Sequence, residues 1–200
     1  MNLPVYLDYN ATTPLAPEVV EAIGPCLGPL FGNPSSPHQY GVAARQAVNK
    51  GREQVAEMLG CAPDEVIWTS GGTEANNMAI KGVALAYAER GRHIITSAVE
   101  HPATLEPCEV LSGQGYEITV LPVDAHGMVR VEDVAAALRD DTILVSIMHA
   151  NNEVGTIQPI AEIARLAHER GALVHTDAAQ TVGKVPVRPE QLGADLLSIA

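Results

Sequence analysis

The sequence Ile67-Trp-Thr-Ser-Gly-Gly-Thr-Glu-Ala-Asn-Asn77 joins a short β-prone run, residues 66–69, to a helix that we predict over residues 73–90. Gly71 and Gly72 at this turn lack a Cβ atom, so the backbone can approach a ligand closely. The N-terminus of a helix offers unbonded N–H groups and positive dipole potential, which together favour phosphate, and the Thr73 hydroxyl adds another donor. The stretch contains neither the dinucleotide glycine fingerprint nor a P-loop. A tight turn with a capped helix is an equally good interpretation of the stretch by itself.

The chain after residue 65 alternates between β-prone and helical segments. The predicted strands are residues 66–69, 93–97, 117–123, 142–148, 172–176 and 195–199. The predicted helices between them are residues 73–90, 102–113, 131–139 and 159–170. Strands such as residues 143–148 are apolar on both faces, which is typical of parallel sheets covered by helices. The pattern predicts an α/β fold, a three-layer αβα arrangement with a mostly parallel sheet.

The N-terminal third of the chain has a different pattern. We expect an extended arm over residues 3–15, a short helix over residues 17–27, a loop rich in proline and glycine, and a long helix over residues 37–59. Apolar residues recur at helical spacing in the last segment, and Gly60 ends it, although Gly51 weakens its middle.

Composition excludes several classes of partner. The chain has 24 acidic and 12 basic residues, a net charge of −12, so we expect neither nucleic acid nor an anionic membrane as a partner. It shows no signal peptide and no apolar run long enough to span a membrane. The three cysteines, Cys26, Cys61 and Cys108, are widely spaced, which favours a reducing compartment, the cytoplasm. We expect each of them to be a buried apolar residue.

Polar residues follow four of the predicted strands. Gly71, Gly72 and Thr73 follow the first, and the remaining groups are Glu100-His101, the run His149 to Gly155, and Asp177 with Gln180. Open α/β sheets bind ligands beyond the carboxyl ends of their strands. We therefore predict a single binding site at this edge of the sheet.

Six segments together resemble the cysteine desulfurases, a branch of the class V aminotransferases with the fold-type I architecture that binds pyridoxal 5'-phosphate. The segments are Tyr6-Leu-Asp-Tyr-Asn-Ala-Thr-Thr-Pro14, Phe31-Gly-Asn-Pro-Ser-Ser36, Thr69-Ser-Gly-Gly-Thr-Glu-Ala-Asn-Asn77, Val99-Glu-His-Pro102, His149-Ala-Asn-Asn-Glu-Val-Gly155 and His175-Thr-Asp-Ala-Ala-Gln180. The resemblance covers essentially all 200 residues.

The resemblance implies a role for each candidate residue. Gly72 and Thr73 would hold the cofactor phosphate, and His101 would stack on the pyridine ring and shuttle protons. Asn152 and Gln180 would contact the phenolic oxygen of the ring, and Asp177 would face its nitrogen, where a carboxylate favours the protonated, electron-withdrawing ring. His175 lies two residues before Asp177, on the same face of the strand, and would support it. Without the resemblance, loop hydrogen bonding for the amides, a capped loop residue for His101 and a helix N-cap for Asp177 remain open.

The residues that would complete the chemistry are not in these 200 residues. The resemblance places the Schiff-base lysine just after a strand like residues 195–200 and the nucleophilic cysteine much later. Lys50, Lys81 and Lys184 match no such context. We therefore interpret the sequence as an N-terminal half. Residues 1–15 would be an arm that belongs with an absent small domain, and residues 16–200 an incomplete cofactor-binding large domain. We expect the isolated chain to be inactive.

The activity implied is conversion of L-cysteine to L-alanine, with persulfide sulfur delivered to iron–sulfur clusters or thiolated cofactors. A homodimer and a sulfur-acceptor or scaffold protein are the implied partners. A selenocysteine lyase, another class V aminotransferase, or a non-catalytic cofactor-binding fragment are the alternatives. A zinc site is not expected, because His149, His168 and His175 lack the spacing of metal ligands.

Overall fold

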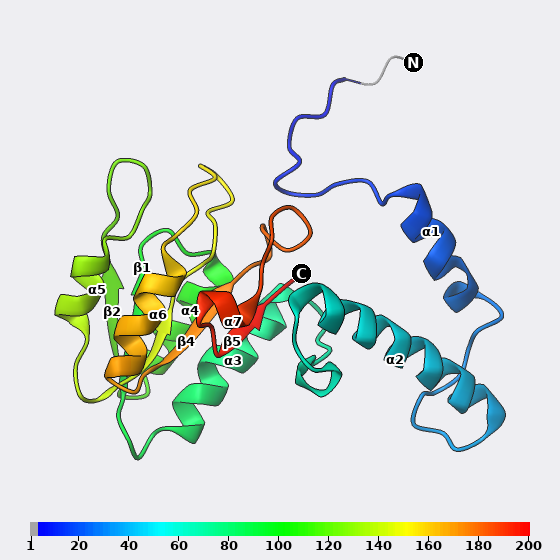
Figure 1. The fold of residues 1–200 in the computed structure, drawn as a ribbon, viewed down its shortest axis with the longest axis horizontal. Coiled ribbons are helices and arrows are strands. Elements are labelled where there is room, and N and C mark those ends of the chain that lie inside the picture. Colours follow the sequence, from blue (N-terminus) through cyan, green and yellow to red (C-terminus); the bar gives the residue numbers. More distant parts are fainter. Residues whose placement is uncertain (1–3) are drawn as a thin grey trace. The chain divides into compact units, whose positions relative to one another are not determined.

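The computed structural model describes residues 4–200, which divide into two compact units between Ile67 and Trp68 (Figure 1). The predicted arm begins in residues 1–3, which lie outside the described residues, and residues 4–15 form neither helix nor strand. The first unit then contains two α-helices and two short 3-10 helices: α1 (Pro17–Ile23), η1 (Gly24–Leu27), α2 (Gln39–Leu59) and η2 (Pro63–Glu65). Gly51 does not interrupt α2, and Gly60 ends it in the left-handed conformation, with φ of 74°.

The second unit contains a parallel sheet with the strand order β2-β1-β3-β4-β5. The strands are β1 (His93–Ser97), β2 (Glu117–Leu121), β3 (Thr142–Ser146), β4 (Leu173–Asp177) and β5 (Leu196–Ser198). The helices are α3 (Gly72–Ala86), α4 (Pro102–Ser112), α5 (Val131–Ala137), α6 (Ile160–Glu169) and α7 (Pro189–Leu192). The parallel sheet and the alternation of strand and helix confirm the predicted α/β architecture, with element ends that differ by a few residues. The short helix α7 was not predicted.

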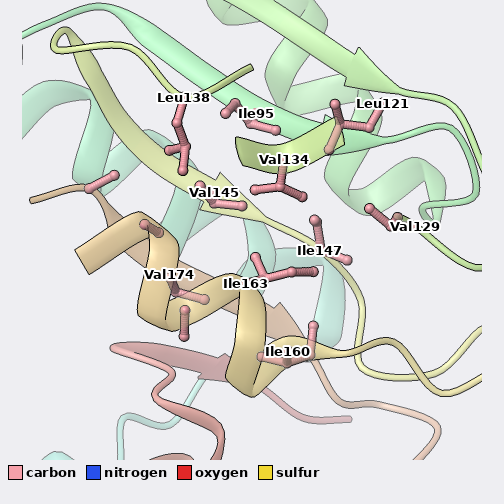
Figure 2. Packing of buried hydrophobic residues seen from close by; sticks show 13 residues of the cluster. Ile95, Leu121, Val129, Val134, Leu138, Val145, Ile147, Ile160, Ile163 and Val174 are labelled. Atoms are coloured by element: carbon pink, nitrogen blue, oxygen red, sulfur yellow. The ribbon is translucent and has the colours of Figure 1, made fainter. Parts of the chain in front are cut away.

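Alternate residues of the central strands face opposite layers of helices. Ile94 packs with α3 and α4, whereas its neighbour Ile95 packs with α5 and α6. Figure 2 shows the cluster that contains Ile95. In it, Val134, Ile160 and Ile163 lie over Val145 and Val174 of the sheet. The apolar pattern of both strand faces therefore produces three layers, as predicted.

Two predictions are wrong. Residues 66–69 form no strand, because the segment joins none of the five strands of the described sheet, and a β-strand needs a neighbour to bond its backbone. Ile67 and Trp68 are 68% and 48% exposed, respectively. Of the cysteines, only Cys108 is buried; Cys26 is exposed and Cys61 is half-buried, because Cys26 lies on a short 3-10 helix that has no buried residue.

Candidate functional site

The carboxyl ends of the five parallel strands lie along one edge of the sheet, and the N-terminus of α3 lies beside two of them. A Cβ atom on Gly72 would be 3.2 Å from the Cβ atom of Ala200, just after β5. Asn76, one turn into α3, bonds to Asp177 at the end of β4. The turn that begins α3 therefore reaches the edge expected for it, although residues 66–69 before it form no strand.

Asp177 is held in a fixed orientation at the end of β4. The side chain is 9% exposed, and its Oδ1 accepts a hydrogen bond from the Ala179 amide over 3.0 Å. Its Oδ2 accepts one from Asn76 Nδ2 over 2.7 Å. These bonds leave each carboxylate oxygen with further acceptor capacity, which a cationic nitrogen of a ligand can use.

Asn76 was not predicted as a site residue. It is 1% exposed, and its Nδ2 also donates to Thr104 Oγ1 of α4 over 3.3 Å, whereas its Oδ1 has no hydrogen-bond partner within residues 4–200. A carboxylate accepts hydrogen bonds only, so the amide nitrogen must face Asp177. The signal in the sequence was a polar residue on the apolar face of α3, in register with Ile80 and Val83.

His175 lies inside the sheet rather than at its edge. One ring nitrogen is 2.8 Å from Ser146 Oγ on β3 and the other is 2.9 Å from Ser198 Oγ on β5. Burial lowers the pKa of His175 to about 4, and the nearby Asp177 only partly opposes this, so the ring is neutral. The residue ties three strands together behind the carboxylate that it was predicted to support.

His101 caps α4 and remains exposed. Its Nδ1 accepts a hydrogen bond from the Ala103 amide over 3.0 Å. The side chain is therefore a helix cap, which does not exclude a second role. Because Nδ1 acts as the acceptor, the ring proton of the neutral form is on Nε2.

The two predicted amide contacts bond to their own neighbours. Asn152 is half-buried and donates to Glu153 Oε1 over 3.0 Å, and Gln180 is half-buried and accepts from Lys184 Nζ over 2.8 Å. Neither side chain is brought against Asp177 by a hydrogen bond in the described part of the chain. The structure therefore places both residues near strand ends, where each bonds to a neighbour in the sequence.

The start of α3 has the features of an anion site. A Cβ atom built on Gly71 would meet no atom within 4 Å, and Thr73 is exposed. Glu74 Oε2 accepts from the Ser70 amide over 2.5 Å, ahead of the helix. The first N–H groups of a helix have no partner within the helix. The open backbone, the helix N-terminus and the Thr73 hydroxyl fit a phosphate group.

Glu100 is a second buried carboxyl group near this edge. It is 6% exposed, and burial raises its pKa to about 8, although hydrogen bonds from Ser97 and the Met148 amide oppose the shift. The charge of Asp177 raises the pKa further. The sequence placed Glu100 among the polar residues after a strand but gave it no role, because the Met148 amide, 48 positions away, is brought near only by the fold.

Residues 5–200 match the family model described as aminotransferase class-V. The chain belongs to this family. A cysteine desulfurase IscS of Dictyoglomus turgidum is 58% identical over 200 residues, which are 100% of this chain and 51% of that protein. This class V aminotransferase chain therefore spans about half the length of the curated relatives it matches.

Solved structures show the same relationship. A NifS-like protein superposes with a TM-score of 0.93 at 42% identity, over 98% of this chain and 55% of that one. The structure named "SspA in complex with cysteine" superposes with a TM-score of 0.94 at 39% identity, over 98% and 56%. Class V aminotransferases and their cysteine desulfurase members depend on pyridoxal 5'-phosphate.

Within residues 4–200, no helix is long and apolar enough to cross a bilayer. The same residues contain no group of three histidine, cysteine or acidic side chains arranged to hold a metal ion.

Proposed function

We propose that the full-length protein carrying this sequence is a pyridoxal 5'-phosphate-dependent cysteine desulfurase, which converts L-cysteine to L-alanine and retains the sulfur as a persulfide. The observation that carries the proposal is the Asp177 carboxylate, held by Asn76 at the sheet edge beside the open N-terminus of α3. The 58% identity to a cysteine desulfurase supports this activity over selenocysteine lyase or another class V reaction.

The residues at the edge fit the cofactor. Gly72 and Thr73 would hold its phosphate, and Asp177 would bind the nitrogen of its ring. His101 would lie on the ring face, and Asn152 and Gln180 would reach the phenolic oxygen. For Asn152, we infer that a ligand oxygen replaces the exposed and weak bond from Nδ2 to Glu153. Gln180 would donate to the ligand oxygen from Nε2, because its Oε1 accepts from Lys184.

Each residue has a defined task in the reaction. When bound, pyridoxal phosphate withdraws electrons from the α-carbon of an amino acid, and this is the chemistry it supplies. Asp177, as an anion, keeps the bound ring nitrogen protonated. His101 holds or moves a proton at Nε2, since its Nδ1 is occupied by the helix cap. The start of α3 anchors the phosphate so that the ring stays oriented against Asp177.

Other components are part of the same proposal. The attachment lysine and the sulfur-accepting cysteine would lie outside these 200 residues. Residues 16–200 would belong to the large domain, and residues 1–15 would pack with a small domain. We also propose a homodimer, a cytoplasmic location and an iron–sulfur scaffold or another sulfur acceptor as partner. The name IscS of the relatives supports a role in iron–sulfur assembly, and the three free cysteines support a reducing compartment.

The test is product formation by the purified full-length protein loaded with cofactor. We expect equal amounts of alanine and persulfide sulfur from L-cysteine, with Asp177→Asn as the inactive control. Transamination without sulfur release would show another class V activity. A strict requirement for selenocysteine would show a lyase, and either result would overturn the proposal.

A further inference from the structure

Two segments at the carboxyl edge of the sheet each end in a residue of the proposed site. Residues 98–101 follow β1 and end at His101, and residues 148–152 follow β3 and end at Asn152. Two buried side chains cross between these segments in opposite directions. Neither of them is among the residues assigned to the cofactor.

The first crossing is made by Glu100. Its Oε1 accepts from the Met148 amide over 2.9 Å and from Ser97 Oγ over 2.6 Å, and its Oε2 is 3.1 Å from the same amide. The Met148 amide therefore depends on a side chain from another segment for its hydrogen bond. An apolar residue at position 100 would leave this buried N–H group without that partner.

The second crossing is made by Asn151. It is 8% exposed, and its Nδ2 donates to the Val99 carbonyl over 3.0 Å. Its Oδ1 accepts from the amides of Glu153 and Val154 over 2.9 Å and 3.0 Å, which shapes the turn just after Asn152. One side chain thus fixes both the place of the loop against residue 99 and its local conformation.

We propose that Glu100 and Asn151 are positioning residues that form a reciprocal clasp and hold His101 and Asn152 at a fixed separation across the cofactor site. The clasp consists of Glu100 with the Met148 amide and Asn151 with the Val99 carbonyl. The inference rests on the proposed function, because the value of a fixed separation depends on a ligand bound between the two segments. One of these hydrogen bonds alone would let residues 98–101 rotate against residues 148–152. The two bonds together prevent this rotation.

The geometry favours positioning over simple stabilisation. A buried carboxyl group near the Asp177 carboxylate has a desolvation cost that well-packed apolar residues avoid. The hydrogen bonds of Glu100 join the ends of β1 and β3, which are already neighbours in the sheet. What the clasp adds is a defined path for the chain beyond those strand ends, where His101 and Asn152 lie.

Four variants of the full-length protein test the clasp. Glu100→Ala removes the acceptor, and Glu100→Gln keeps a carbonyl oxygen for the Met148 amide. Asn151→Asp keeps the acceptor for residues 153 and 154 but loses the donor to Val99. Glu109→Ala, an exposed glutamate on α4, is the matched control.

Hydrogen exchange of the cofactor-free protein is the first measurement. We expect Glu100→Ala to raise the exchange rate of the Met148 amide roughly tenfold or more. We also expect faster exchange in residues 98–101 for Asn151→Asp. Glu100→Gln and Glu109→Ala should stay near wild type. Unchanged exchange in both disruptive variants would overturn the clasp.

Visible circular dichroism of the bound cofactor and steady-state kinetics are the second measurement. We expect Glu100→Ala and Asn151→Asp to weaken the dichroic band and lower kcat for L-cysteine, with recovery in Glu100→Gln. Binding of inorganic phosphate to the cofactor-free protein should be unchanged. Altered exchange with a normal dichroic band would show a purely structural role and overturn the proposal. A wild-type protein with these signals but no alanine product would instead contradict the desulfurase assignment.

Discussion

The side-chain amide of Asn76 donates a hydrogen bond to Oδ2 of Asp177 over 2.7 Å, although the two residues lie 101 positions apart in the sequence. The bond joins the first turns of α3 to the end of β4. It therefore connects the proposed phosphate site to the proposed partner of the ring nitrogen. A ligand bound at both points is held against one rigid pair of elements.

Replacing Asn76 by alanine should destabilise the protein. The change removes hydrogen bonds to Asp177 and Thr104 and leaves a buried carboxylate with one donor fewer, so we expect a loss of about 1–3 kcal/mol in the free energy of unfolding. Urea denaturation measures this. The control is Asn77→Ala, because the Asn77 side chain donates within its own helix, to the Thr73 carbonyl. Equal stability of the two variants would contradict a structural role for Asn76.

Asp177→Asn should lower kcat for L-cysteine by roughly 10²-fold or more, because the bound ring nitrogen would lose its charge partner. Asparagine keeps one of the two side-chain oxygens, which can accept from the Asn76 amide or from the Ala179 amide, so one hydrogen bond is lost and the fold should be retained. Asp140→Asn, at a fully exposed side chain, is the control. Steady-state assays and far-ultraviolet circular dichroism decide the question, and near-normal turnover would show that Asp177 has a structural role only.

Thr73→Val should weaken phosphate binding at the start of α3. Valine keeps the shape of threonine but loses the hydroxyl donor, so we expect a roughly tenfold higher Kd for the cofactor or for inorganic phosphate. Thr73→Ser keeps the donor and should bind nearly as well as wild type. Fluorescence titration of the cofactor-free protein measures both. Identical affinities for the three proteins would place the phosphate elsewhere.

Because of His175, the free energy of unfolding should be smaller in mild acid than at neutral pH. Burial lowers its pKa from 6.5 to about 4, so between these values the unfolded chain binds a proton that the folded protein does not. The contribution of His175 to the free energy of unfolding is therefore complete above pH 6.5 and falls as the pH decreases toward 4. Urea unfolding at pH 7, 6 and 5 should show a smaller loss for His175→Asn than for wild type. Equal losses for the two proteins would contradict this role of His175.

The contribution of Glu100 to the free energy of unfolding should depend on pH in the opposite direction. Burial raises its pKa from 4.5 to about 8, so the folded protein binds the proton more tightly than the unfolded chain does. This contribution to stability is complete below pH 4.5 and is lost as the pH rises through 8. The stability of Glu100→Gln relative to wild type should therefore increase between pH 5 and pH 8. A constant difference would show that the carboxyl group stays ionised in the folded state.

The sequence by itself determined the α/β class and was sufficient to predict a site at the carboxyl edge of the sheet. Apolar residues on both faces of β1, β3 and β4 require helices on both sides, and in parallel strands the polar residues after each strand must gather at one edge. Patterns within single segments were sufficient for these predictions. The motifs at Gly72–Thr73, His101 and Asp177 each lie within a few residues of an element end, where short-range pattern and capping decide the conformation.

Only the tertiary structure decided which side chains hold the site together. The bonds from Asn76 to Asp177, from Glu100 to Met148 and from Asn151 to Val99 join residues far apart in the sequence, and a local pattern does not encode such pairs. The same reason explains why the strand predicted at residues 66–69 does not form. A β-strand depends on a neighbouring strand rather than on the segment's own propensity. Helix and strand periodicity is a property of one segment, but hydrogen-bond satisfaction of a buried group is a property of the whole fold.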